Sequence, residues 1–498
     1  MRDIILWSLA AAATVLQITQ ALELVKRSSP AVIGFEIERR KVPILPESDD
    51  RRVRRQSKVV SQVLDNKKTL YFCNLTLGTP PQKLQMHIDT GSSDLWVNTP
   101  SSKICQDRRN LCQAGGTYDP KKSSTYKRIN SNFNITYADG SSAVGDYVSD
   151  KINVGGISLE DFQFAVGYQS TSREGVLGIG YPTNEVQAVR NREAPYANLP
   201  KALVDGGLIK SNAYSIWLND LDSNTGEILF GGVNKAKFEG SLKTLPVIRN
   251  RGTYKDLAVA LTGLAVNSGS GTQQLPSANF PFSAVLDTGS SLTYLPDAIV
   301  SDIFDAVSAQ WDPESGAAYV PCSLAGSKSK FVFSFSEPKI SVDMDEMVIN
   351  PGPGSNGEAL KFDDGTLACI FGIAPSQHAI SILGDTFIRS AYVVYDLDND
   401  EISLAQTRFN TSSNDILEIG TGKGSVPDAT AASGAVSSAP RTATATVQTT
   451  LTPIATSGSN AGVRPVKSTA GAVPTAKPEY PIGMIAGLAG AGLVFAAM

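Results

Sequence analysis

The 498-residue chain has little histidine and lacks the motifs of several large hydrolase classes. It contains two histidines and no His-Glu-x-x-His sequence, which gives no basis for a zinc site. No Gly-x-Ser-x-Gly turn is present to expose a catalytic serine, and no phosphate-binding glycine loop stands between a strand and a helix. We therefore expect neither a metal nor a cofactor.

Charge is also sparse, and it is unevenly distributed. Charged residues make up 18% of the chain, and the formal net charge is −4. Residues 22–55 hold nine basic and six acidic residues, so the remainder of the chain is acidic. An acidic body argues against a nucleic-acid partner, and we expect a monomer that acts on peptide or protein substrates.

The N-terminal region predicts two removable segments. Residues 1–21 combine an early arginine with an apolar run and small residues, which is typical of a secretory signal peptide. A buried helix is the alternative. Residues 22–55 predict a basic propeptide that lies on the acidic body and is cut at Arg54-Arg55. A solvated charged tail is the alternative there.

The C-terminal region predicts a stalk and a membrane anchor. Residues 411–478 are rich in Ser, Thr, Ala, Gly and Pro, which predicts a disordered, O-glycosylated stalk. Residues 479–498 resemble a hydrophobic GPI-anchor signal that is removed, and a spanning tail anchor is the alternative. We expect attachment between Ser468 and Gly471, with Asn460 as a second choice, and hence a secreted protein on the outer face of the membrane.

Five cysteines in a secreted chain predict disulfides and one unpaired thiol. Cys105 and Cys112 could close a short loop, and Cys322 could pair with Cys369. Cys73 then remains as a buried, inert thiol. Three Asn-x-Ser/Thr glycosylation sequons occur, at Asn74, Asn134 and Asn410.

The body of the chain has the pattern of an all-β protein with a few short helices. Short alternating apolar runs are separated by Gly, Pro, Asn and Asp, and the clearest helix lies within 295–311. Asp-Thr-Gly-Ser-Ser occurs twice, at 89–93 and 287–291, each time after an apolar run. This repeat predicts two similar β lobes, over 69–245 and 246–410.

The repeated motif predicts a catalytic carboxyl pair. One copy alone is most often an Asx-type turn. If two similar lobes pack about a pseudo-twofold axis, however, Asp89 and Asp287 face each other and share one proton. One carboxylate can then act as a base on water, while the other donates a proton to a carbonyl oxygen. That chemistry hydrolyses a peptide bond without a covalent intermediate.

The motifs together resemble the pepsin family of aspartic proteases, and among these the fungal, GPI-anchored, yapsin-like branch. The resemblance covers about 69–410 and depends on YFCNLTLGTPPQ, IDTGSSDLWV, ITYADGSSAVG, GVLGIGYP, LDTGSSLTYLP and ILGDTFIRSAYVVYDLDNDEISLA. It implies a bilobal all-β fold with a cleft between the lobes, zymogen processing, and activity at acid pH.

The resemblance also implies roles for individual residues. Asp89 and Asp287 match the catalytic pair. The residues that surround the water and orient these carboxyls match Gly91, Gly289, Ser92 and Ser290. Tyr137 matches the tyrosine of the flap that closes over the substrate, and Trp96 matches the tryptophan that hydrogen-bonds it. Asp139 matches an acid near the flap tip that accepts Lys or Arg before the cleaved bond.

A catalytically inactive surface glycoprotein on the same fold is the alternative function, and the stalk and anchor would suit it. Both Asp-Thr-Gly motifs, Tyr137 and a processable propeptide are nevertheless intact, which favours an enzyme. The Cys105–Cys112 loop is basic where yapsins often carry a long acidic insert. This difference favours broad acid-protease activity over strict dibasic specificity.

Overall fold

The computed structural model describes residues 31–39 and 70–441, apart from 224, 269–270, 277–278, 314, 354–357 and 378. The predicted signal peptide and GPI-anchor signal lie outside the described residues. So do the predicted attachment residues Ser468, Gly471 and Asn460. Within the described part of the chain, no helix is long and apolar enough to cross a membrane.

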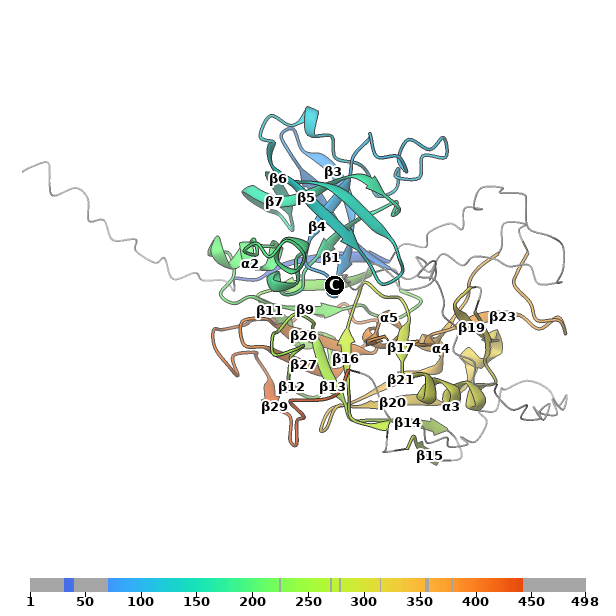
Figure 1. Cartoon of the computed structure of the whole chain (residues 1–498). Helices are drawn as coiled ribbons and strands as arrows, with labels where there is room; N and C mark the ends of the chain where they lie inside the picture. The colour runs from blue at the N-terminus through green and yellow to red at the C-terminus, as the bar shows by residue number, and fades with distance from the viewer. Residues whose placement is uncertain are drawn as a thin grey trace, which may run out of the picture.

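The fold is all-β with a few short helices, as predicted, and consists of two stacked β-rich halves (Figure 1). A 14-stranded sheet runs through both halves. Across the sheet, its strands are β29 (Ala429–Ala431), β12 (Leu242–Pro246), β27 (Glu401–Gln406), β26 (Ala391–Asp396), β9 (Ala213–Trp217), β10 (Thr225–Phe230), β1 (Ile33–Arg39), β2 (Tyr71–Leu77), β3 (Gln82–Asp89), β8 (Gly175–Gly178), β4 (Leu95–Asn98), β7 (Ile157–Ser170), β6 (Ser142–Val154) and β5 (Lys127–Thr136). The predicted lobe boundary at 245/246 falls inside β12, which belongs to this shared sheet.

Smaller sheets complete the second half. A five-stranded sheet contains β13 (Ala258–Leu261), β16 (Phe282–Leu286), β25 (Ser381–Leu383), β17 (Thr293–Leu295) and β24 (Ile373–Pro375). One four-stranded sheet contains β15 (Gly271–Gln274), β14 (Gly263–Ser268), β20 (Lys330–Ser334) and β21 (Lys339–Asp343). A second four-stranded sheet contains β18 (Gln310–Asp312), β19 (Ala317–Pro321), β23 (Ala368–Phe371) and β22 (Val348–Ile349). A two-stranded sheet pairs β11 (Gly232–Asn234) with β28 (Ile416–Glu418).

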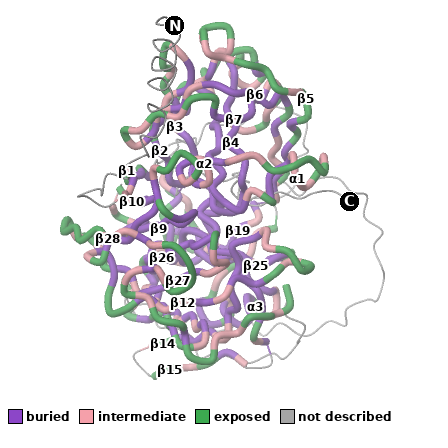
Figure 2. Tube along the Cα trace, turned by 90° about the vertical axis from the view of Figure 1, so that its left-hand side faces the viewer, coloured by how far each residue is buried: buried purple, intermediate pink, exposed green. Residues whose placement is uncertain are grey.

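The α-helices are short, and one of them, α5 (Asp385–Ile388), is fully buried. They are α1 (Val186–Val189), α2 (Leu199–Asp205), α3 (Asp297–Val307), α4 (Met344–Met347) and α5. The longest, α3, lies within the predicted helical range and buries Ile299, Ile303 and Val307 on one face. Buried residues run continuously through both halves, so the core extends across the junction where the two Asp-Thr-Gly turns meet (Figure 2).

Residues 411–441 belong to the packed body, so the predicted start of the stalk at 411 is too early. β28 pairs with β11, and β29 runs parallel to β12, in the orange-red segment beside β12 in Figure 1. The small, polar composition of this segment did not indicate that it forms strands. Its backbone N–H and C=O groups make the sheet hydrogen bonds, and these groups are present whatever the side chains are. The rest of the predicted stalk, 442–478, lies outside the described residues.

β1 comes from the predicted propeptide and occupies the middle of the large sheet. It pairs antiparallel with β10 from Ile33 to Glu38, and it pairs with β2 at Glu38 and Arg39. Ile33 and Ile37 are buried in the main core. Part of the segment that we expected to lie on the body is therefore built into it.

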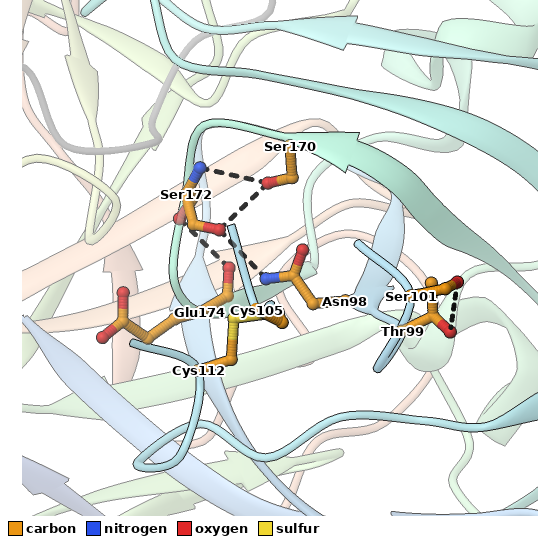
Figure 3. The surroundings of a disulfide bond; sticks show 8 residues. All are labelled: Asn98, Thr99, Ser101, Cys105, Cys112, Ser170, Ser172 and Glu174. Carbon is orange, nitrogen blue, oxygen red and sulfur yellow. Dashed lines mark hydrogen bonds between the residues drawn. A yellow bond between two sulfur atoms is a disulfide. The ribbon is translucent and has the colours of Figure 1, made fainter. Parts of the chain in front are cut away.

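Both predicted disulfides form, and Cys73 is a free, buried thiol. Burial raises the pKa of Cys73 to about 12, which keeps the thiol protonated and unreactive. The Cys105–Cys112 bond closes its loop beside Asn98, whose side-chain amide donates to the Ser172 carbonyl oxygen at 3.0 Å (Figure 3). This contact joins the end of β4 to the turn that follows β7.

Candidate active site

The first Asp-Thr-Gly turn starts where β3 ends, at Asp89. The backbone N–H of Gly91 donates to Asp89 Oδ1 at 2.8 Å, and that of Ser92 donates to the same oxygen at 3.2 Å. The Ser92 hydroxyl donates to the other carboxyl oxygen, Oδ2. Both oxygens therefore have a fixed partner, which locks the orientation of the carboxyl group.

The second turn repeats this arrangement in the other half. β16 ends one residue before Asp287, and the Gly289 N–H donates to Asp287 Oδ1 at 2.8 Å. The Ser290 hydroxyl donates to Oδ2 at 2.7 Å. The matching contacts show that the repeated sequence gives repeated geometry.

A glycine from a neighbouring segment lies behind each turn and permits close backbone contact. A side chain on Gly178 would put its Cβ 2.6 Å from the Ser93 nitrogen. One on Gly384 would put its Cβ 2.4 Å from the Ser290 carbonyl oxygen. Only glycine fits at either place without displacing backbone. This accounts for the two apolar residues followed by glycine that occur after the Asp-Thr-Gly motif in each half, at 176–178 and at 382–384.

The two turns are joined directly through their threonines. The Thr90 hydroxyl donates to the Leu286 carbonyl oxygen at 2.9 Å and accepts the Thr288 N–H at 3.0 Å. In return, the Thr288 hydroxyl donates to the Ile88 carbonyl oxygen at 3.0 Å and accepts the Thr90 N–H at 3.2 Å. This reciprocal set crosses the junction of the halves and fixes the spacing of the turns.

The geometry brings Asp89 and Asp287 together as a buried pair, and neither side chain is exposed. Burial, followed by the adjacent Asp287 carboxylate, raises the pKa of Asp89 well above its usual range. Burial also raises the pKa of Asp287. Two adjacent, buried carboxylates cannot both ionise at low cost, so the pair retains a proton.

The residues that we predicted to form a flap come together at the hairpin that joins β5 to β6. Its turn closes through Tyr137 N–H to the Ser141 carbonyl oxygen at 2.8 Å. The Trp96 indole N–H donates to the Tyr137 hydroxyl at 2.6 Å, as the resemblance implied. Asp139 lies half-buried in the turn and accepts the Ser141 N–H at 2.8 Å.

Comparison with known proteins agrees with this geometry. The model of the eukaryotic aspartyl protease family matches residues 70–407. The chain belongs to this family. It is an aspartic endopeptidase of the pepsin type, which acts on peptide substrates. Membership in the yapsin-like, GPI-anchored branch stays a prediction.

Fungal relatives extend the similarity beyond the catalytic domain. The protease is 53% identical to the probable aspartic-type endopeptidase OPSB of Arthroderma benhamiae, over 100% of this chain and 99% of the relative. It is 52% identical to the probable aspartic-type endopeptidase opsB of Aspergillus oryzae, over 85% and 86%. It is 38% identical to candidapepsin-3 of Candida albicans, over 73% and 85%.

The sequence did not reveal every residue of the protease that lies near the dyad. Tyr294 is half-buried, and its pKa is raised by desolvation and then by the carboxylates of Asp139 and Asp287. It packs on the same apolar cluster as Ala138, in the turn between β5 and β6, and Val285, two residues before Asp287. Tyr294 stands seven residues after Asp287, as Trp96 stands seven after Asp89, and this spacing was the signal available.

The remaining predicted positions lie on the surface of the protease. The sequon residues Asn74, Asn134 and Asn410 are exposed, and their glycosylation stays a prediction. Asn134 alternates with buried Phe133 and Ile135 on β5, so its side chain points away from the Tyr137 cluster. Among the residues that the structure describes, no group of three or more His, Cys, Asp or Glu could hold a metal ion.

Proposed function

We propose that this protease is a secreted, surface-anchored endopeptidase, made as a zymogen, in which Asp89 and Asp287 act on the peptide bond at acid pH. The proposal depends above all on the symmetric, buried carboxyl pair held by the reciprocal threonine contacts. Its test is hydrolysis of a denatured protein at acid pH, with and without pepstatin, by the wild-type and Asp287→Asn chains. Absence of pepstatin-sensitive hydrolysis in the wild type would overturn it.

The mechanism uses one proton shared by the pair. The ionised carboxylate takes a proton from a water molecule as the water oxygen bonds to the peptide carbonyl carbon. The protonated carboxyl donates to the carbonyl oxygen, which gives a neutral tetrahedral diol. When the diol collapses and the C–N bond breaks, the leaving nitrogen receives the proton that the first carboxylate took from water. The second carboxylate takes a proton from a diol hydroxyl as the new carboxylic acid forms, so the pair again holds one proton. Gly91, Gly289, Ser92 and Ser290 keep both carboxyls in position throughout.

The same mechanism sets the pH dependence. At very low pH both carboxyls are protonated, and no base remains. When pH rises above the upper apparent pKa of the pair, both are ionised and no acid remains. Activity is therefore expected at acid pH, with a decline towards neutral pH. The raised pKa values of Asp89 and Asp287 support retention of the shared proton over the acid range.

Asp139 is proposed to admit basic as well as hydrophobic residues before the cleaved bond. Its carboxylate accepts the Ser141 N–H at the proposed flap turn, and the charges of Asp139 and Asp287 both raise the pKa of Tyr294. Asp139→Ala will lower kcat/KM about fivefold for peptides with Lys at this position, because a partly exposed charge pair is lost. Matched peptides with Phe are the control. An equal change for Lys and Phe peptides would contradict the prediction.

Zymogen control is supported by the position of β1. Its residues lie between β10 and β2, so the proposed propeptide is tied to the body by a full strand. Arg39, at the end of β1, is only 7% exposed. Near neutral pH, the acidic body attracts the basic 22–55 segment, and this attraction weakens as body carboxylates gain protons. Acid would thus loosen the segment and favour cleavage at Arg54-Arg55.

Blocking this cleavage provides a test. A chain that combines Arg54→Ala with Arg55→Ala is expected to retain the propeptide and to show about tenfold lower kcat/KM near neutral pH than the processed enzyme, which corresponds to about 1.4 kcal/mol. N-terminal sequencing would establish where each protein begins, and peptide assays across pH would establish activity. Lys67→Ala with Lys68→Ala is the control for loss of two basic residues. Equal activity of precursor and processed enzyme at every pH would refute inhibition by the propeptide.

Surface attachment is the remaining part of the proposal. The signal peptide, the stalk beyond 441 and the hydrophobic 479–498 segment support passage through the secretory pathway and a GPI anchor. A relative from Candida albicans that is 38% identical is named secreted aspartic protease 3, which agrees with secretion. Release of the protease from cells by a phosphatidylinositol-specific phospholipase would distinguish a lipid anchor from a spanning tail.

A further inference from the structure

Residues 429–441, here called the C-terminal strap, lie beyond the 70–407 range of the protease family and are packed along the second half of the molecule. The strap starts as β29, which runs parallel to β12. The Ala432 N–H then donates to the Thr244 carbonyl oxygen at 2.9 Å, and the Ser433 N–H donates to Glu337 Oε2 at 2.7 Å. Figure 1 shows its first part beside β12.

The far end of the strap is fixed next to the strand that leads to the dyad. The Ser283 N–H donates to the Pro440 carbonyl oxygen at 2.8 Å, and Ser283 lies on β16, four residues before Asp287. Arg441 forms an ion pair with Asp256 at 2.8 Å. Asp256 is 9% exposed and also accepts a hydrogen bond from the Asn250 side chain. The strap is therefore held at both ends.

Between these ends, Val436 and Ala439 pack on an apolar surface that adjoins the dyad. We call it the Asp287-side patch; it consists of Ile248, Ala258, Ala260, Val285, Ile380 and Ile382. Val285 lies two residues before Asp287. Val436 and Ala439 are only partly buried, so each combines a packed side with an accessible apolar side.

The same patch reaches the flap. Ala138, which directly follows the flap residue Tyr137, packs against it, and so does Tyr294. Tyr294 lies on β17, in the same five-stranded sheet as β16, the strand that leads to Asp287. The Asp287-side patch thus spans the interval from the dyad to the flap. A peptide held between dyad and flap would pass along it.

We propose that Val436 and Ala439 of the C-terminal strap help to bind substrate side chains on one side of the cleaved bond. These two residues would then contribute to substrate specificity, although they lie outside the part of the chain that matches the protease family. The accessible apolar faces of Val436 and Ala439 would favour apolar substrate residues there. The inference depends on the proposed role of Asp89 and Asp287. It adds a binding element that the repeated motifs do not encode, because the strap belongs to neither repeat.

A charge introduced on the strap tests the inference. In the full chain, we compare peptides that carry either Glu or Lys at a single substrate position. Val436→Lys should raise the ratio of kcat/KM for the Glu peptide to that for the Lys peptide about fivefold at one such position, because the new lysine can form a partly exposed charge pair with Glu. Peptides would be varied one position at a time on both sides of the cleaved bond. Ala431→Lys, on the exposed part of β29, is the matched control and should leave every ratio unchanged.

A second variant guards against simple loss of packing. Ala439→Leu keeps an apolar contact but adds bulk, which would occupy space that a large substrate side chain needs. It should lower kcat/KM about fivefold for peptides with a bulky residue at the same substrate position, relative to peptides with alanine there. Melting temperatures would record any change in stability. Uniform changes across all peptides, or unchanged ratios, would show that the strap is only a brace and would overturn the inference. Failure of the wild type to cleave any peptide would instead refute the proposed function.

Discussion

Asp287→Asn is expected to lower kcat for peptide hydrolysis about 10⁴-fold at acid pH, at the upper end of what acid–base catalysis supplies. An amide at this position can still accept the Gly289 N–H, so the turn retains its main contact. It can neither take a proton from water nor donate one to a carbonyl oxygen as a carboxyl does. The pair loses its shared proton, while the threonine contacts between the turns remain.

The control for this variant is Asp305→Asn, on the exposed face of α3. It removes the same charge far from the turns and should leave kcat within about twofold of the wild type. Circular dichroism and melting temperature would show that Asp287→Asn is folded, which is expected because loss of a buried carboxyl relieves desolvation. Substantial residual activity in a folded, pure Asp287→Asn protein would contradict the assignment of the dyad.

The dyad could be predicted from sequence because the same five residues occur twice. Each copy encodes its own local contacts, from Gly91 and Ser92 to Asp89 and from Gly289 and Ser290 to Asp287. The alternation of apolar residues predicted the strands in the same way, since each strand buries one face. Such features depend on neighbours in the chain, and a pattern read along the chain can find them.

The features that were missed depend on contacts between distant segments. The strand pairing of β1 with β10 joins residues almost two hundred positions apart, and nothing in IGFEIER specifies that partner. The order in 411–441 depends on backbone pairing to β11 and β12, which a small, polar composition does not indicate. A pattern read along the chain also gave no sign that Glu185 is buried.

Glu185 is a buried carboxyl with incomplete hydrogen bonding, bonded to Tyr196, which packs against the cluster that contains Tyr137 and Trp96. Its side chain is fully buried; Oε2 accepts the Tyr196 N–H at 2.8 Å, and Oε1 has no hydrogen-bond partner. Burial, and then the charge of Asp94, raise its pKa from 4.5 to about 10. Asp94 is itself buried and accepts the hydroxyl groups of Tyr147 and Tyr196 at 2.7 and 3.1 Å. The folded protease therefore keeps Glu185 protonated at neutral pH.

This proton makes the folded state less stable as pH rises. Between pH 4.5 and about 10, the folded protein holds a proton on Glu185 that the unfolded chain releases. The free energy of unfolding consequently falls by about 1.4 kcal/mol per pH unit across that range, and the contribution is fully present only below 4.5. From pH 4.5 to 7, Glu185 alone is expected to remove roughly 3 kcal/mol.

Glu185→Gln removes this titration while it preserves size and the carbonyl acceptor for Tyr196. Relative to the wild type, its free energy of unfolding should rise by roughly 3 kcal/mol between pH 4.5 and 7, as measured by urea denaturation at several pH values. Glu193→Gln, an exposed glutamate, is the control and should show no such trend. A difference between Glu185→Gln and wild type that stays constant with pH would show that Glu185 has the same pKa in the folded and unfolded protein, and would contradict the prediction. Asp94, a second buried carboxyl whose pKa is raised by burial, would then be the next residue to test by the same measurement.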